Sequence, residues 1–296
     1  MSKYICLDIG GTSIKHGVLN DDLELITSGN TDTEAFLGGE AVLGKAIGIV
    51  KSYNEDCNPA GICVSTAGMV DVEKGSIFHC GPTMPNYTGT PIKARMEEAF
   101  SLPCEVENDV NCAGLAEAHF GAARGSKICL CLTVGTGIGG SLILDGSVYN
   151  GISGSACEIG YMHMHGSSFE ELASASAVLQ RAEKRKGITL DGKELFRLAR
   201  EGDAVCIEEI EGMVKYLAEG IANIIYVSNP ETVVLGGGIM NEGDYLKPLL
   251  MAKLEERLVP AVFRSFRLEF ARFGNNAGMI GAYYHFRQMV GRRGKA

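Results

Sequence analysis

The sequence predicts an α/β protein with two domains, and three observations support this fold class. Strand-like and helix-like apolar patterns alternate along nearly the whole chain. A glycine-rich loop follows an apolar run twice, at residues 8–12 and 133–140, and leads into a further strand each time. The length of 296 residues is typical of two domains with a sizeable core. The loop and the strands around it therefore resemble a duplicated unit.

The first half of the chain should form alternating strands and helices. Phe36, Leu43 and Ile47 recur at helical spacing, and a helix should start with Thr90 as its N-cap and Pro91 at its first position. The expected elements are strands over 4–7, 14–19 and 23–28, a helix over 36–50, a strand over 61–65, a helix from 91, a strand over 105–107 and a helix over 110–120.

The second half should repeat this scheme. A third glycine turn, Gly236-Gly237-Gly238, follows a short apolar strand there. The expected elements are strands over 128–133 and 141–144, helices over about 170–186, 192–200 and 204–228, strands over 232–235 and 267–271, and a final helix over about 276–289. We expect a smaller N-terminal domain over residues 1–108, joined by the C-terminal helix at about 279–296, and a larger domain over 109–278.

Composition excludes several classes of function. The net charge is −9, which argues against nonspecific binding to nucleic acid or to an anionic membrane surface. No apolar stretch approaches the roughly 20 residues of a membrane span, and a strand begins almost at once where a signal peptide would stand. The 10 cysteines are scattered singly and are typical of buried thiols in a reducing compartment. We therefore expect a cytoplasmic protein without nucleic-acid or membrane partners.

The glycine loops suggest a nucleotide site. Glycines at a strand end allow backbone N–H groups to turn toward a phosphate, although an ordinary hairpin turn is an equally good interpretation of a single loop. Two loops of the same design favour a nucleotide clamp, which is typical of kinases and ATPases. Between them, Glu107-Asn108-Asp109 stands at a predicted strand-to-helix junction, where carboxylates can serve either acid–base chemistry or helix capping.

With these motifs, the sequence resembles the sugar kinases of the ROK family over nearly its whole length. The resemblance rests on Asp8-x-Gly10-Gly11-Thr12, Glu107-Asn108-Asp109-x-Asn111, Gly135-Thr136-Gly137-x-Gly139-Gly140, Glu158-x-Gly160 and Gly236-Gly237-Gly238. It implies an actin-like ATPase (ribonuclease H-like) fold with two α/β domains around a central cleft. It also implies a homodimer that uses ATP and Mg²⁺ to phosphorylate a hexose, often on its 6-hydroxyl.

One segment departs from the family pattern. The family usually has a histidine three residues after the glutamate of Glu158-x-Gly160, followed by a cysteine-rich zinc loop. Here that position is Tyr161, and residues 162–169 contain no cysteine. His163 and His165 without neighbouring cysteines make an incomplete site, so we expect no zinc. The chain therefore resembles the β-glucoside kinases and related zinc-lacking hexose kinases.

The resemblance assigns the sugar half of the reaction. Phosphoryl transfer depends on positioning and charge stabilisation, and a carboxylate that accepts the proton of the attacking hydroxyl adds about 10²–10⁴-fold. It implies Asp109 as this general base, with helix capping as the alternative role. The expected sugar ligands are Asn86, Asn108, Glu158, Tyr161 and Glu170. A purely structural role is the alternative for three of these residues: Asn86 in a turn, Tyr161 in packing and Glu170 at a helix start.

The resemblance assigns the ATP half as well. Backbone groups of the two loops should hold the phosphates, and the third glycine turn should leave flat space for adenosine. The expected ATP residues are Asp8, Gly10, Gly11, Thr12, Thr133, Gly135, Thr136, Gly137, Gly237 and Gly238. Asp8 should act through Mg²⁺, by way of a water, because Mg²⁺ keeps several waters and few carboxylates.

Three functions compete. The leading expectation is phosphorylation of a hexose or β-glucoside, with N-acetylmannosamine or another N-acyl hexosamine as the alternative substrate. Repressors of the same family carry a helix-turn-helix before the first loop. Only seven residues precede Asp8 here, so we expect no DNA-binding domain of this kind. A filament or chaperone-type ATPase would not need the constellation of Glu107, Asn108, Asp109 and Glu158.

Overall fold

The computed structural model describes residues 1–293, which form two compact units with one five-stranded sheet each. Unit 1 comprises Met1–Ala116, Asn150–Ala156 and the chain from Asn275 onward, and unit 2 comprises Glu117–Tyr149 and Cys157–Gly274. The expected boundary between residues 108 and 109 is the junction of a strand and a helix within unit 1. The assignment of two functional domains stays a prediction.

The sheet of unit 1 has the strand order β3-β2-β1-β4-β7. β1, β2 and β3 are antiparallel, whereas β4 and β7 run parallel to β1. The central strands consist of apolar residues that are buried on both faces, which is typical of a sheet covered by helices on each side. The bounds are Lys3–Ile9 for β1, Ser13–Asn20 for β2, Leu25–Asp32 for β3, Gly61–Thr66 for β4 and Cys104–Asn108 for β7.

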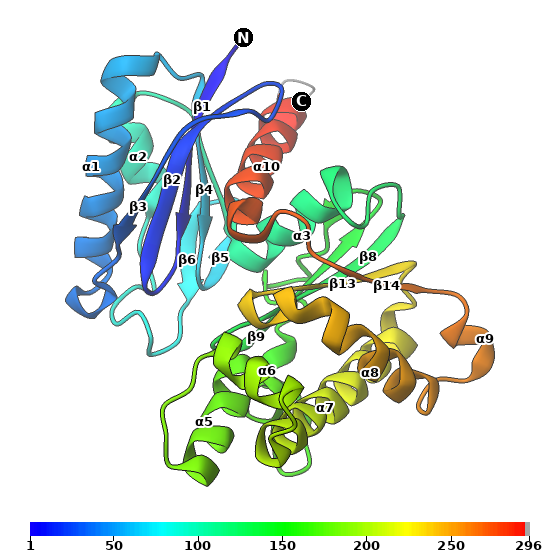
Figure 1. Cartoon of the computed structure of the whole chain (residues 1–296). Coiled ribbons are helices and arrows are strands. Elements are labelled where there is room, and N and C mark those ends of the chain that lie inside the picture. The colour runs from blue at the N-terminus through cyan, green and yellow to red at the C-terminus, as the bar shows by residue number, and fades with distance from the viewer. Residues whose placement is uncertain (294–296) are drawn as a thin grey trace. The chain divides into compact units, whose positions relative to one another are not determined.

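Helices cover both faces of this sheet. α1 (Gly39–Cys57) and α2 (Ile92–Phe100) lie on one face, and α10 (Ala277–Arg293) lies on the other (Figure 1). The final helix therefore belongs to unit 1, and residues 294–296 of the expected C-terminal helix lie outside the described residues. The remaining elements are the turn η1 (Ala35–Leu37), the hairpin β5 (Met69–Asp71) and β6 (Ser76–His79), and α3 (Asp109–Phe120), which follows β7.

The sheet of unit 2 repeats this topology. Its order is β10-β9-β8-β13-β14, and it again has three antiparallel strands followed by two strands parallel to the first. The duplicated unit that the sequence predicts is thus present in both units. The bounds are Ile128–Val134 for β8, Ile138–Leu144 for β9, Ser147–Val148 for β10, Thr232–Gly236 for β13 and Arg267–Phe270 for β14.

Helices gather on one side of the second sheet, where α7 and α8 pack against each other (Figure 1). Their buried leucines and isoleucines form one core with the inward residues of β8 and β13. The helices are α4 (Phe169–Ala173), α5 (Ala175–Lys186), α6 (Gly192–Arg200), α7 (Ala204–Ser228), α8 (Gly243–Glu255) and α9 (Pro260–Phe263). Shorter elements are η2 (Ile159–Tyr161), β11 (His163–Met164), β12 (Ser167–Ser168), η3 (Gly238–Glu242) and η4 (Gly274–Asn276).

The structure differs from the expected elements in three places. The single helix expected over 170–186 is two helices, because Ser174 is extended and its hydroxyl accepts the Ala177 N–H as the N-cap of α5. Thr90 does not cap α2, since its hydroxyl donates to the Tyr87 carbonyl. No element was expected between residues 239 and 266, where α8 carries Pro248 in its interior and so lacks an obvious helical pattern.

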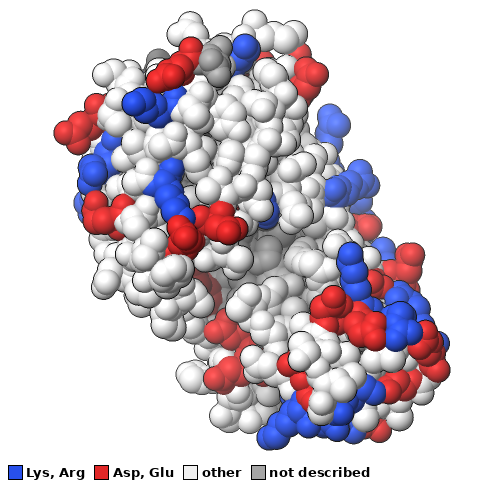
Figure 2. Space-filling view, turned by 60° about the vertical axis from the view of Figure 1, so that its left-hand side comes forward, with Lys and Arg blue, Asp and Glu red and all other residues white. Residues whose placement is uncertain are grey.

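Charges of both signs share the surface. On the face shown in Figure 2, Lys and Arg side chains of the described residues lie among Asp and Glu side chains, without an extended basic area. This distribution agrees with the net charge of −9. No helix in the described part of the chain is long and apolar enough to cross a membrane.

Candidate active site

The parallel strands of unit 1 align polar residues at their carboxyl ends. Asp8 on β1 pairs in register with Ser65 on β4, and Ser65 pairs with Glu107 on β7. The next row contains Asn108, which leads directly into α3 at Asp109. Because ligands of α/β sheets bind beyond the carboxyl ends of parallel strands, the predicted base Asp109 and the predicted Mg²⁺ residue Asp8 lie at the expected edge.

Asp8 is a partly shielded carboxylate with two polar neighbours. The Ser65 hydroxyl donates to its Oδ1 at 2.6 Å, and Lys15 Nζ lies 3.7 Å from its Oδ2. Burial raises the pKa of Asp8, and the hydrogen bond from Ser65 opposes this shift. Oxygen donors of this kind suit a hard cation such as Mg²⁺, so the residues present fit the predicted ion.

The Asn108–Asp109 turn is held by a dense set of hydrogen bonds. Asn108 Oδ1 accepts the N–H groups of Val110 and Asn111 at 2.9 and 3.0 Å, so Asn108 is the residue that caps α3. Its amide nitrogen donates to the Gly68 carbonyl at 3.0 Å and to Asp109 Oδ1 at 2.9 Å. Asp109 is thus the first residue of the helix, and its orientation is fixed by its neighbour.

Both glycine loops are the tips of β-hairpins. The first joins β1 to β2, where Gly10 N–H donates to the Ser13 carbonyl, and the second joins β8 to β9, where Gly135 N–H donates to the Gly137 carbonyl. Gly11 and Thr12 occupy the first tip, and Thr136 the second. The hairpin interpretation of both loops is therefore confirmed, and phosphate binding by the same loops stays a prediction.

The predicted sugar residue Glu170 lies against the second glycine loop within unit 2. Its Oε2 accepts the Ile138 N–H at 3.4 Å. A Cβ atom on Gly137 would approach this oxygen to 2.4 Å, and a Cβ on Gly160 would approach it to 2.9 Å. At Gly160 a Cβ would also lie 2.4 Å from the Ile138 carbonyl oxygen, so backbone packing favours glycine there. The Glu158-x-Gly160 motif, the second loop and Glu170 therefore lie together.

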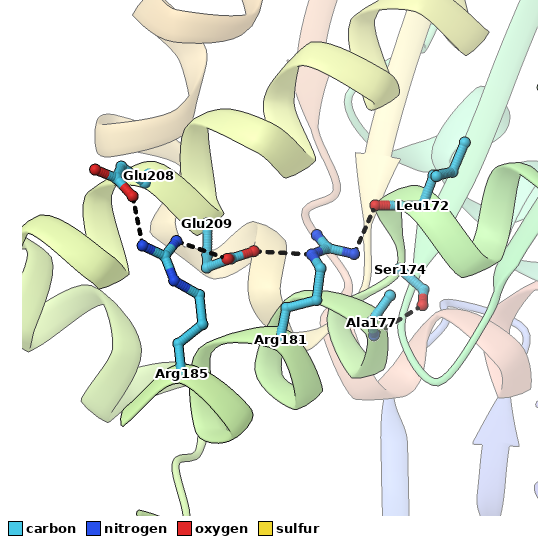
Figure 3. Close-up of polar contacts among 7 residues, drawn as sticks. All are labelled: Leu172, Ser174, Ala177, Arg181, Arg185, Glu208 and Glu209. Carbon is cyan, nitrogen blue, oxygen red and sulfur yellow. Dashed lines mark hydrogen bonds and ion pairs between the residues drawn. The ribbon is translucent and has the colours of Figure 1, made fainter. Parts of the chain in front are cut away.

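The short helix α4, which carries Glu170, is tied to its neighbours by an ionic network. Arg181 on α5 donates to the Leu172 carbonyl at 3.1 Å and to Glu209 on α7 at 2.8 Å (Figure 3). Arg185 donates to the other oxygen of Glu209 at 2.9 Å and also contacts Glu208. The network thus fixes the end of α4 against α5 and α7.

Five further predicted residues occupy turns, loops or short 3-10 helices. Glu158 precedes the turn η2, and Tyr161 at its end is 53% exposed. Asn86 is exposed and has a φ of 54°. Gly237 follows β13 beside the end of β8, where a Cβ would lie 2.2 Å from the Val134 carbonyl oxygen, and Gly238 opens η3.

A hollow adjoins the third glycine turn and its neighbouring strand. It has a volume of about 700 Å³ and is lined by residues of η3, α8 and β14, among them Met240, Asn241, Phe270 and Ala271. Thr133, which pairs with Gly236 across β8 and β13, stands on the same sheet. The predicted adenosine residues of unit 2 therefore have a cavity next to them.

The segment in place of the family's zinc loop is a small hairpin. β11 and β12 pair between His163 and Ser168, and His165 at the turn lies 2.8 Å from Glu219 on α7. Residues 1–293 contain no group of three or more His, Cys, Asp or Glu side chains that could hold a metal ion. The arrangement thus links this segment to α7 through an ion pair between side chains.

Comparison with known proteins identifies the family. The model of the ROK family matches residues 4–289, which is nearly the whole chain. The chain belongs to the ROK family. A 47% identical protein of Clostridium perfringens, covering 97% of this chain and 99% of that protein, is uncharacterized. A β-glucoside kinase of Klebsiella pneumoniae is 30% identical, with 97% of each chain covered.

Solved structures of ROK proteins have the same fold. A ROK glucokinase from Streptomyces griseus, in complex with glucose and AMPPNP, has a TM-score of 0.83 at 25% identity, with 97% of this chain and 100% of that chain covered. A Listeria monocytogenes protein described as a candidate N-acetylmannosamine kinase has a TM-score of 0.87 at 29% identity, covering 97% and 99%. The fold is therefore the actin-like ATPase fold of ROK sugar kinases.

Sequence reasoning missed two contributors to this site. Ser65 donates to Asp8 and lies beside it in the sheet. The signal in the sequence is a polar residue at the end of the expected strand over 61–65. His285 on α10 lies 3.6 Å from Glu107, and no local pattern in the sequence points to it.

Proposed function

We propose that this ROK protein transfers the γ-phosphoryl group of ATP to the 6-hydroxyl of a hexose or β-glucoside. The observation that carries the proposal is the placement of Asp109 at the carboxyl end of β7, on the same sheet edge as Asp8. A carboxylate fixed there by Asn108 is suited to accept the proton of the attacking hydroxyl. The likeness to a β-glucoside kinase and to a glucokinase supports the class of substrate.

In this proposal, five of the predicted residues bind the sugar and a sixth accepts the proton. Asn86 and Asn108 of unit 1, and Glu158, Tyr161 and Glu170 of unit 2, bind sugar hydroxyls or the ring, while Asp109 accepts the proton. Asn108 would share its amide between the sugar and the contacts that it already makes.

The ATP residues likewise come from both hairpin tips. Backbone groups of Gly10, Gly11, Thr12, Gly135, Thr136 and Gly137 bind phosphates, with Thr133 at the base of the second loop, and Gly237 and Gly238 border the adenosine. Asp8 would hold Mg²⁺ through a water, and the bound ion would supply positive charge to neutralise the phosphates. Lys15, near Asp8, adds positive charge to the same place.

A second candidate substrate is N-acetylmannosamine or another N-acyl hexosamine. The likeness to the Listeria monocytogenes protein favours it. Tyr161 is exposed and could stack on a pyranose ring, an acyl group or an aglycone. Family resemblance further suggests a homodimer, which sedimentation velocity would test.

The experiment is an ADP-release assay with Mg·ATP and glucose, cellobiose, gentiobiose, mannose, N-acetylmannosamine and N-acetylglucosamine. Turnover with a β-disaccharide would establish a β-glucoside kinase, and turnover with one monosaccharide would name the hexose. NMR of the product should show the phosphate on the 6-hydroxyl. ATP hydrolysis that no sugar accelerates would contradict the proposal.

A further inference from the structure

Glu107 is a buried carboxylate that the proposed reaction leaves unused. It is 2% exposed and precedes Asn108 and Asp109 directly. Its Oε1 accepts the Asn108 backbone N–H at 2.8 Å and the Asn111 side-chain amide at 3.1 Å. Glu107 therefore holds the N-terminal turn of α3 through two hydrogen bonds, in addition to the cap that Asn108 provides.

The other oxygen of Glu107 faces the final helix. His285 Nδ1 of α10 lies 3.6 Å from Oε2, and the imidazole is 5% exposed. His285 Nε2 is buried without a hydrogen-bond partner among the described residues, so the ring makes its polar contact through Nδ1 alone. Burying an imidazole costs free energy unless a polar group compensates it, and here the compensating group is Glu107.

One face of α10 contacts Asp8, α3 and Glu107 at three successive positions. Residues 278, 281 and 285 share this face because they are spaced by three and four positions. A Cβ on Gly278 would lie 2.5 Å from the Asp8 carboxylate, and a Cβ on Gly281 would lie 1.8 Å from the Cys112 carbonyl oxygen of α3. The backbone of α10 thus packs closely against Asp8 and α3. His285, on the same face of the helix, approaches Glu107.

From this geometry we propose that Glu107 and His285 are positioning residues through which α10 fixes the Asn108–Asp109 turn. The inference rests on the proposed role of Asp109 as the base. Glu107 would orient Asp109 through Asn108 and Asn111, without touching the sugar, and His285 would fix the carboxylate of Glu107. A turn that loses these contacts still belongs to a folded helix but presents Asp109 at the wrong angle.

The test compares Glu107→Ala and Glu107→Gln. Alanine leaves two donors of the turn unpaired, so kcat should fall about 10- to 100-fold for each folded molecule. Glutamine keeps an acceptor oxygen in place and should restore kcat to within about threefold of the wild type. His285→Leu should lower kcat about tenfold, and His285→Asn, whose amide lies near the former Nδ1, should recover most of it. The affinity for ATP alone, measured by calorimetry, should stay unchanged in all four.

Glu105→Ala is the matched control. Glu105 lies two residues earlier on β7, on the same strand face, and is fully buried. It pairs with Lys93 at 2.9 Å and with Arg293 at the end of α10 at 2.6 Å, but no hydrogen bond joins it to the turn in the described residues. Its loss should lower the unfolding temperature while kcat per folded molecule stays the same. The inference is overturned if Glu107→Ala and His285→Leu likewise lose only stability. A wild-type enzyme that phosphorylates no sugar would instead reject the proposed function itself.

Discussion

At the residue scale, burial changes the proton affinity of Glu107 and His285 in opposite directions. Desolvation raises the pKa of Glu107 to about 7 and lowers the pKa of His285 to about 4. The hydrogen bonds from Asn108 and Asn111 lower the pKa of Glu107 but do not outweigh its burial. Both side chains are therefore mostly neutral between these two values, which reduces the cost of burying the pair.

This shift predicts how stability depends on pH. The folded state holds the Glu107 proton up to about pH 7, whereas the unfolded state loses it near 4.5, so this contribution is full below 4.5 and lost above 7. The contribution of His285 has the opposite sign: it is present above 6.5 and lost as the pH falls through about 4.

Glu107→Gln isolates the first contribution. The unfolding free energy of the wild type, minus that of the variant, should fall by about 2 kcal/mol between pH 5 and pH 8. Denaturant unfolding at four pH values would measure it. A difference that stays constant with pH would mean that Glu107 is ionised throughout this range.

At the element scale, the packing of α10 behind Asp8 predicts an effect of a single methyl group. Gly278→Ala would place a Cβ 2.5 Å from the Asp8 carboxylate, which must then move. The KM for Mg·ATP should rise at least several-fold, and overpacking should cost about 1–3 kcal/mol of stability. Steady-state kinetics and thermal unfolding would measure the two effects.

Gly291→Ala is the control on the same helix. A Cβ at Gly291 would meet no atom within 4 Å, so alanine should leave the KM unchanged and stabilise the helix by about 0.5–1 kcal/mol. Equal effects of the two substitutions would show that the close approach of α10 to Asp8 does not matter for the nucleotide.

The elements also show where sequence reasoning succeeds. β1, β8, α6 and α7 are predicted within one residue or two, because apolar runs, capping aspartates and Asn229-Pro230 mark their limits. The break at Ser174 is missed because apolar spacing continues across it. His285 is missed because only the packing of the final helix on β7 brings it to Glu107.

At the scale of the whole molecule, duplication was the most predictable property. The two glycine loops predict two hairpins, and both sheets repeat one strand order around them. The motif residues fall into two groups, one in each unit, with Asp8, Asn108 and Asp109 in the first and Gly137, Glu158 and Glu170 in the second. The family is thus readable from the sequence, whereas the choice of sugar depends on side-chain details that no motif encodes.

The absence of cysteines from residues 162–169 predicts that a zinc chelator has no effect on the enzyme. The 162–169 segment is a hairpin whose His165 pairs with Glu219, and we predict that no zinc supports it. A strong zinc chelator, with Mg²⁺ in excess, should leave the unfolding temperature and the turnover unchanged. Activity that is lost on chelation and restored by zinc would contradict this prediction.

The central claim is that Asp109 accepts the proton of the attacking sugar hydroxyl. The most direct measurement is kcat for Asp109→Asn together with the sugar affinity from calorimetry. Asparagine keeps a hydrogen-bonding side chain but cannot take the proton, so kcat should fall about 10²–10⁴-fold while the dissociation constant of the sugar changes little. A variant with nearly normal turnover would contradict the account.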